Sequence, residues 1–119
     1  MTRCECEGLE GLELAKCLAP PRGDYELDIP ITNNLSLIIS SSGLILKQVI
    51  IDDNLPFART VERRVPDEYL NHVNLKVKKE DLPCLAVKAL VQASRHGSVV
   101  SRKKLERCKR IIEGVSRKC

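Results

Sequence analysis

The chain has 119 residues, of which 43% are hydrophobic and three are aromatic, and its formal net charge of +4 is unevenly distributed. Residues 95–119 carry nine Lys or Arg against two acidic residues, whereas residues 1–94 carry 11 against 14. A chain of this length can fold around an aliphatic core without a disulfide or a metal, but it lacks the aromatic platforms of OB-type and RRM-type single-strand binders.

The N-terminal residues 3–19 predict a short amphipathic helix, with leucines among glutamates, that ends at Pro20 and Pro21. The glutamates interrupt any apolar run, so this segment does not have the pattern of a secretory signal peptide. No other run has the length and apolar character of a membrane span. We therefore expect a cytoplasmic or nuclear protein, in which cysteines are free thiols or metal ligands.

Three strand-like runs follow the two prolines. Residues 25–29 alternate between apolar and acidic side chains, as a half-buried strand requires. Residues 35–39 and 44–51 are apolar on both faces and flank the loop 40–43. This pattern predicts a hairpin that is covered on both sides, by helices or by a partner.

The middle of the chain predicts a connection and then a fourth strand. Residues 55–71 contain two prolines and show no clear period, which indicates a connection with a helical turn around residues 57–64. Residues 73–77 alternate between apolar and polar side chains. They predict a fourth strand whose outer face is basic.

Two helices are predicted in the C-terminal part. Asp81 is the expected N-cap of the first helix, whose apolar face extends to Ala93, and Gly97 is its expected terminator. Ser101 is the expected cap of the second helix. The inward stripe of this second helix is formed by Leu105, Cys108, Ile112 and Val115.

These elements assemble most simply into one domain of the α+β class. We expect a small antiparallel sheet of about four strands, with two C-terminal helices packed on one face. The domain divides into a cysteine-containing N-terminal segment (1–23), a sheet (24–79) and a helical, basic C-terminal part (81–119).

Catalysis is not predicted. The two histidines, His72 and His96, do not lie in the pattern of a zinc protease, a catalytic triad or a phosphate-binding loop. The glycine-rich fingerprints for dinucleotides and triphosphates are also missing from the sequence. We therefore expect that the protein is not an enzyme, and we infer no catalytic residue and no small-molecule substrate.

The cysteines near the N-terminus have two interpretations that stay open. Cys4, Cys6 and Cys17 supply three soft ligands for zinc. Their Cys-x-Cys spacing differs from the spacing typical of structural zinc sites, so free thiols on a mobile N-terminus are the alternative. The fourth zinc ligand is not identified by the sequence, and the candidates are Cys84, His96, Cys108 and Cys119.

The later cysteines have different expected roles. Cys84 and Cys108 fall on the inward stripes of the predicted helices, which predicts buried free thiols that act as small apolar side chains. Cys119 is the last residue of the chain. We expect it to be mobile and oxidisable.

The basic C-terminal helix gives the strongest functional signal. Lys and Arg side chains neutralise phosphates, and such contacts drive salt-sensitive binding that does not depend on sequence. We expect a small accessory protein that binds nucleic acid, RNA or a non-specific duplex rather than a defined DNA site. The expected phosphate contacts are Arg102, Lys103, Lys104, Arg107, Lys109 and Arg110.

A competing hypothesis is a protein-interaction module. The apolar hairpin 35–51 would then form a surface for a homodimer or another partner. A strict monomer whose hairpin is protected from hydrogen exchange would argue against this hypothesis.

Residues 85–105, which read LAVKALVQASRHGSVVSRKKL, resemble part of the winged-helix output domain of bacterial response regulators. The similarity covers the first helix of that domain and the turn into its second helix, about a fifth of this chain. The resemblance implies a preceding antiparallel sheet and a helix–turn–helix geometry. The matching residues are Gly97, Val99, Val100, Ser101, Arg102 and Leu105.

A second resemblance rests on composition. An early Cys-x-Cys, formed by Cys4 and Cys6, and a basic tail make the chain similar to the small cysteine-rich accessory proteins of some plant RNA viruses. Several of those proteins bind RNA and suppress silencing. This resemblance implies a host–virus interaction as an alternative function.

Overall fold

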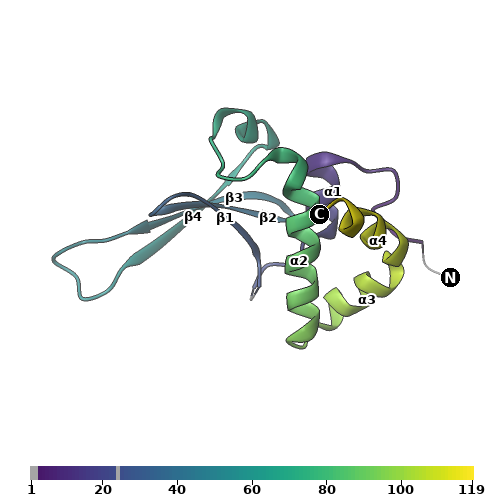
Figure 1. Cartoon of the computed structure of the whole chain (residues 1–119). Coiled ribbons are helices and arrows are strands. Elements are labelled where there is room, and N and C mark those ends of the chain that lie inside the picture. The colour runs from purple at the N-terminus through teal and green to yellow at the C-terminus, as the bar shows by residue number, and fades with distance from the viewer. Residues whose placement is uncertain (1–2, 24) are drawn as a thin grey trace.

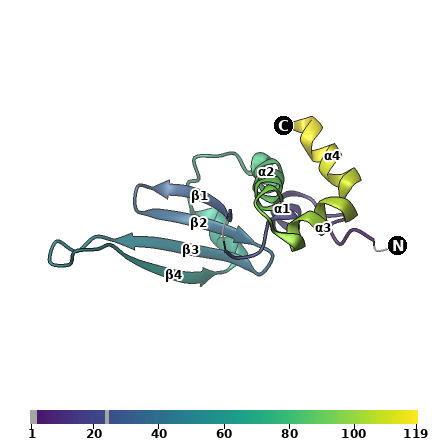
Figure 2. The same ribbon diagram turned by 90° about the horizontal axis from the view of Figure 1, so that it is seen from below.

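The computed structural model describes residues 3–23 and 25–119. Residues 1 and 2 of the predicted N-terminal segment, and residue 24 at the start of the predicted sheet, lie outside the described residues. An antiparallel sheet of four strands lies beside a group of helices (Figures 1 and 2), which confirms the predicted α+β class. The strands are neighbours in sequence order, namely β1 (Leu27–Thr32), β2 (Leu35–Ser40), β3 (Gly43–Ile50) and β4 (Arg59–Val65).

The helices gather at one end of the sheet, away from the turn that joins β3 and β4 (Figure 1). In the described residues, no helix is both long enough and apolar enough to cross a membrane. The helices are α1 (Gly11–Leu18), α2 (Leu82–Arg95), α3 (Val99–Arg107) and α4 (Lys109–Lys118), with short 3-10 helices η1 (Asp67–His72) and η2 (Lys79–Asp81).

One face of the sheet belongs to the main core. Leu27 pairs with Ile39 and Ile29 pairs with Leu37, so these four side chains lie on the same face. All four are buried in one cluster with the inward side chains of the first two helices, Ala15 and Leu18 of α1 and Leu82, Ala86 and Leu90 of α2. The apolar hairpin of the sequence is therefore covered on this face by helices of the same chain.

The opposite face of the sheet also buries apolar side chains. Ile38 of β2 and Ile45 of β3 form a cross-strand pair there, and both are buried. Arg22, from the turn before β1, forms an ion pair with Glu62 of β4 on the same face. This ion pair ties the turn after α1 to the edge strand.

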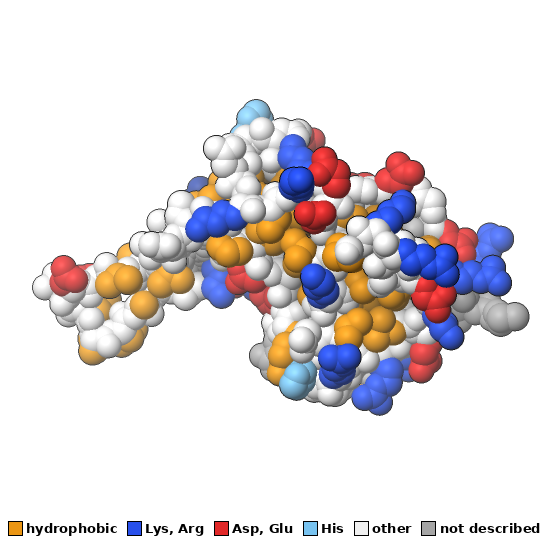
Figure 3. Space-filling view, in the orientation of Figure 1, with side chains coloured by type: hydrophobic (Ala, Val, Ile, Leu, Met, Phe, Trp, Pro, Cys, Tyr) orange, Lys and Arg blue, Asp and Glu red, His pale blue; other side chains and the backbone are white. Residues whose placement is uncertain are grey.

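The β3–β4 hairpin projects beyond the rest of the molecule (Figure 1). The radius of gyration of 15.2 Å is larger than the value of about 13.5 Å expected for a compact domain of this length. We call residues 50–61 the arm. Ile51, Leu55 and Phe57 are exposed on it, with 65% of Phe57 exposed, and Figure 3 shows apolar side chains at this end of the molecule.

The fourth strand lies elsewhere than the sequence predicts. The prediction of a connection with a helical turn around 57–64 is wrong, because residues 59–65 form β4 and pair with β3. The prediction of a strand at 73–77 is also wrong. Strand β4 is an edge strand whose side chains are mostly exposed and charged. Its sequence therefore lacks the alternation of apolar residues from which a strand is predicted.

The sheet hairpin and the N-terminal helix are close to their predicted positions. The turn between β2 and β3 is shorter than predicted, since Ser40 still pairs with Gly43, where the backbone φ of +125° suits glycine. The N-terminal helix begins at Gly11, and the residues before it form turns.

The C-terminal helices differ from the prediction at two points. Helix α2 begins after Asp81 and ends before Gly97, as predicted. The cap of the next helix is Ser98 and not Ser101, since the Ser98 hydroxyl accepts a hydrogen bond from the Ser101 N–H at 3.2 Å. The single predicted second helix is divided at Cys108 into α3 and α4.

Candidate functional site

The turn between α2 and α3 fixes the position of the basic helices. Gly97 adopts a φ of +100°, which terminates α2 and lets the chain reverse. The next residue, Ser98, caps α3 through its hydroxyl. Helices α2 and α3 are therefore joined by a tight turn, and α4 continues from α3 after the bend at Cys108.

The outer surface of α3 and α4 is basic. Figure 3 shows Lys and Arg side chains gathered over this end of the molecule, with acidic side chains among them. None of four predicted phosphate contacts forms an ion pair with a described carboxylate, and all four are exposed: Arg102, Lys103, Lys109 and Arg110. We call these four residues the basic surface.

Lys104, a fifth predicted phosphate contact, lies inside the molecule. Its side chain is buried, and its ammonium donates a hydrogen bond to the Cys17 carbonyl oxygen at 2.6 Å. The Glu5 carboxylate is 3.8 Å away. Burial lowers the pKa of Lys104, and the attraction of Glu5 offsets only part of this effect.

Arg107, the sixth predicted contact, is half-buried and already paired. Its guanidinium donates hydrogen bonds to both oxygens of Glu5, at 2.9 and 3.3 Å. The hydrogen bond from Arg107 lowers the pKa of the Glu5 carboxyl. Lys104 and Arg107 therefore hold the N-terminal segment against α3, and the structure does not present them with the basic surface.

All six cysteines are paired as disulfides, although the sequence predicted free thiols at Cys84 and Cys108. Cys108 is buried as predicted. These pairs cannot be predicted from the sequence alone. A disulfide requires two Cα atoms about 4.4–6.8 Å apart in space, whatever the separation of the two cysteines in the sequence. The pairs, with their Cα–Cα distances, are Cys4–Cys108 (4.9 Å), Cys6–Cys17 (5.7 Å) and Cys84–Cys119 (5.9 Å).

Two of the three disulfides lie next to each other. The sulfur atoms of Cys4, Cys6 and Cys108 are all within 4.8 Å of one another, and these three residues are buried. Cys6 is in turn bonded to Cys17. The structure thus gathers the three predicted zinc ligands and adds Cys108 to them. The signal for Cys108 in the sequence was its place on the inward stripe of the helix.

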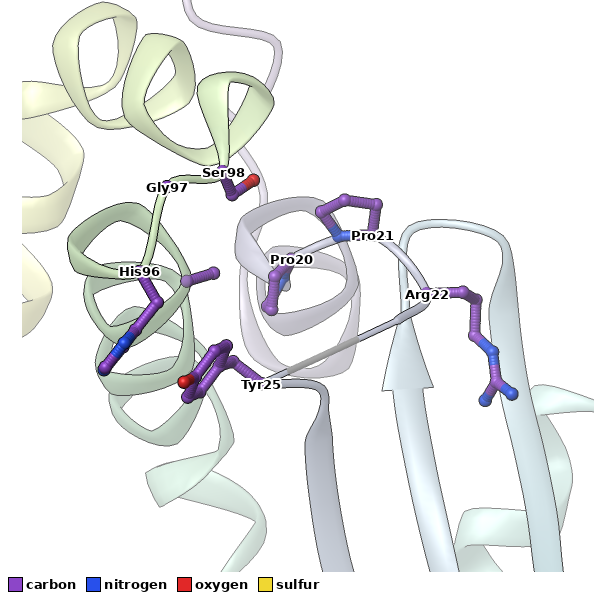
Figure 4. Close-up of a pocket in the computed structure, with 8 residues that line it drawn as sticks. Pro20, Pro21, Arg22, Tyr25, His96, Gly97 and Ser98 are labelled. Carbon is purple, nitrogen blue, oxygen red and sulfur yellow. The ribbon is translucent and has the colours of Figure 1, made fainter.

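A pocket of about 280 Å³ lies between the turn that follows α1 and the end of α2 (Figure 4). The rings of Tyr25 and His96 stack in it, with their centroids 4.4 Å apart. Arg22 points away from this stack, toward the sheet, where it is paired with Glu62. The described lining of this pocket contains no carboxylate side chain.

Comparison with protein-family models, with curated proteins and with solved structures gives no match for this chain. Neither resemblance found in the sequence is therefore supported by a match.

Proposed function

We propose that the protein binds nucleic acid through the basic surface of α3 and α4, and that the ligand is RNA or a non-specific duplex. The observation that supports this proposal is the set of four exposed cations without a described carboxylate partner, Arg102, Lys103, Lys109 and Arg110. Unpaired cations are free to replace the counterions of a phosphate backbone.

The proposal keeps four of the six phosphate contacts that were predicted from the sequence. Lys104 and Arg107 are engaged with Cys17 and Glu5 and keep the helices in position. Four phosphate contacts predict that the logarithm of the binding constant falls with the logarithm of salt concentration with a slope of about −3 to −4.

Backbone recognition fits this surface better than base stacking. No aromatic residue lies on α3 or α4: Phe57 is on the arm, Tyr69 is in η1, and Tyr25 stacks on His96 at the end of α2. Single-strand binders rely on aromatic rings for stacking, whereas duplexes are recognised through their phosphates and their shape. We therefore expect duplex RNA or DNA to bind more tightly than an unstructured single strand.

The test is a salt-dependent binding titration with two charge-reversed variants. Lys103→Glu combined with Arg110→Glu places two negative charges on the basic surface. Lys76→Glu combined with Lys78→Glu makes the same charge change on exposed residues between η1 and η2. Duplex RNA, duplex DNA and single-stranded RNA serve as probes.

The two variants should behave differently. In about 100 mM salt we expect the first variant to lose at least about 30-fold in affinity, since two contacts become repulsive, and the salt slope to fall by about 2. The second variant should lose less than about threefold. Equal losses in both variants, or an unchanged salt slope in the first, would refute the basic surface as the binding site.

Self-association is a second candidate function, and the arm is its candidate interface. The centre of the hairpin 35–51 is buried within the monomer, with Leu37, Ile38 and Ile39 among the fully buried side chains. The exposed apolar side chains of this hairpin region are instead on the arm, including Phe57. A homodimer would therefore form through the arm, and light scattering of the full chain would detect it.

A cytoplasmic or nuclear location belongs to the same proposal, because nucleic acid is present there. Disulfides persist mainly in oxidising compartments, so in the cytoplasm or nucleus the cysteines are expected to be reduced or bound to metal. Alkylation of thiols in intact cells, followed by mass spectrometry, would show the state of the cysteines. Full protection of all six as disulfides would exclude both compartments.

A further inference from the structure

Three buried sulfur atoms, from the N-terminal turns and from the α3–α4 bend, lie close together, and a fourth, half-buried sulfur is bonded to one of them. Cys4 and Cys6 come from the N-terminal turns, Cys17 comes from α1 and Cys108 joins α3 to α4. The sulfurs of Cys4, Cys6 and Cys108 are mutually within 4.8 Å, and Cys17 is bonded to Cys6. A tetrahedral zinc site with Zn–S bonds of about 2.3 Å needs sulfurs about 3.8 Å apart, a separation that Cys4, Cys6 and Cys108 can reach with small shifts once their disulfides are reduced.

The backbone around these sulfurs favours thiolates. The Cys6 N–H donates a hydrogen bond to the Cys4 sulfur at 3.3 Å, and this bond is buried. Hydrogen bonds from surrounding groups orient and stabilise metal-bound ligands. Cys108 lies at the bend between the two helices, where it is both the C-cap of α3 and the N-cap of α4.

Charged side chains of both signs lie near these cysteines, including the Glu5 carboxylate, which is within 4.8 Å of the Cys6 and Cys17 sulfurs. The Lys104 ammonium is bonded to the carbonyl of Cys17, one of the four cysteines. Arg107 precedes Cys108 in the chain and is half-buried. A zinc ion with four thiolates is doubly negative, and Lys104 and Arg107, which both contact Glu5, would offset part of the combined negative charge.

We infer that Cys4, Cys6, Cys17 and Cys108 bind one Zn²⁺ in the reduced chain, and that the adjacent disulfides Cys4–Cys108 and Cys6–Cys17 are the oxidised, metal-free form of the same site. The inference goes beyond nucleic-acid binding and does not depend on it. Both forms connect the N-terminal turns to α1 and to the α3–α4 bend, so the basic surface keeps its support in either state.

The conversion between the two forms is balanced when a reductant is supplied. A phosphine reductant converts each disulfide and one water molecule into two thiols and one phosphine oxide. Zn²⁺ then displaces the four thiol protons into solvent as the four Zn–S bonds form. A pocket of about 290 Å³ lined by both Cys4 and Cys108 gives the reductant and the metal access to this site.

The experiment measures metal binding to the full chain after reduction with a phosphine and removal of metal by a chelator. Zn²⁺ is titrated in competition with a chromophoric chelator, and elemental analysis gives the stoichiometry. Co²⁺ is used as a second probe, because its visible spectrum reports tetrahedral thiolate coordination without any mutation. The key variant is Cys108→Ser, and the matched control is Cys84→Ser combined with Cys119→Ser, which removes the pair outside the cluster.

We expect one equivalent of Zn²⁺ in the wild type and in the Cys84/Cys119 control, and a cobalt tetrathiolate spectrum in both. Cys108→Ser should weaken Zn²⁺ binding by at least about 100-fold, since loss of a surrounding hydrogen bond alone costs 10- to 100-fold. The inference is overturned if the reduced wild type binds no stoichiometric metal, if its Co²⁺ spectrum lacks four-thiolate character, or if Cys108→Ser and the control lose metal equally.

Discussion

Lys103 and Lys104 are neighbours in the sequence, but the structure gives them opposite roles. Lys103 is exposed on the basic surface, whereas Lys104 is buried and donates to the Cys17 carbonyl at 2.6 Å. Replacing each in turn by Met keeps the length of the side chain and removes the charge. The pair of variants therefore tests directly which lysine supports the fold and which one binds a phosphate.

The magnitude for Lys104→Met follows from its contacts. A hydrogen bond from a charged donor contributes about 1.5–3 kcal/mol. The Glu5 carboxylate, 3.8 Å away, is largely exposed and adds at most a few tenths of a kcal/mol. Met avoids the cost of burying the ammonium, which is the reason that the pKa of Lys104 is lowered. We expect a net loss of about 1–2 kcal/mol in the free energy of unfolding.

The assay is urea unfolding of the oxidised full chain at neutral pH, followed by far-UV circular dichroism. With a urea m-value of about 1.5 kcal/mol/M, Lys104→Met should lower the unfolding midpoint by about 1 M. Lys103→Met should change the free energy of unfolding by less than about 0.5 kcal/mol. In the nucleic-acid titration the order reverses, since Lys103→Met should reduce the salt slope by about 1 and Lys104→Met should leave it unchanged.

The reasoning is refuted if the two variants are equally stable. It is also refuted if Lys104→Met changes the salt slope while Lys103→Met does not, because the buried lysine would then be the phosphate contact. Unfolding of the wild type at the same protein concentration is the reference for both variants.

Three further predictions concern the sheet, the cap and the arm. Arg22 lowers the pKa of Glu62 through a hydrogen bond, so this exposed pair adds stability above pH about 4.3 that is lost as the pH falls through the folded-state pKa. Glu62→Gln should therefore cost about 0.5 kcal/mol at pH 7 and nothing at pH 2, and an equal cost at both values would contradict the assignment. Ser98→Ala should lower the free energy of unfolding by about 1 kcal/mol, as loss of an N-cap does, and a cost below that of Ser116→Ala at an exposed position would contradict its role. Phe57→Ser should shift any dimer seen by light scattering toward monomer by at least about tenfold in dissociation constant, and an unchanged constant would exclude the arm as the interface.

Periodicity in the sequence predicted the elements that bury an apolar stripe. Strands β2 and β3 and helix α2 are long apolar or amphipathic segments with clear ends, and the structure has them close to the predicted positions. Strand β4 has no such stripe, since its residues are mostly exposed at an edge. Residues 73–77 alternate between apolar and polar side chains, but this alternation indicates which side chains are buried and does not show that the segment pairs with another strand.

The sequence predicted that the candidate site is basic, but it did not predict which of its basic residues face solvent. The excess of Lys and Arg in residues 95–119 is a property of the sequence. Which of these residues face solvent depends on packing, because Lys104 and Arg107 are three apart on α3 and both meet Glu5. No pattern within the helix identifies a partner that lies about a hundred positions earlier in the chain.

The sequence by itself determined the α+β class, the aliphatic core and the basic C-terminal part, because composition and apolar period are local properties of the chain. The tertiary structure alone decided which lysines remain exposed, where the arm projects and which cysteines meet. Cys4 and Cys108 are 104 residues apart in sequence, yet their Cα atoms lie 4.9 Å apart. That proximity is set by how the N-terminal turns pack against α3 and α4, and local sequence patterns carry no information about it.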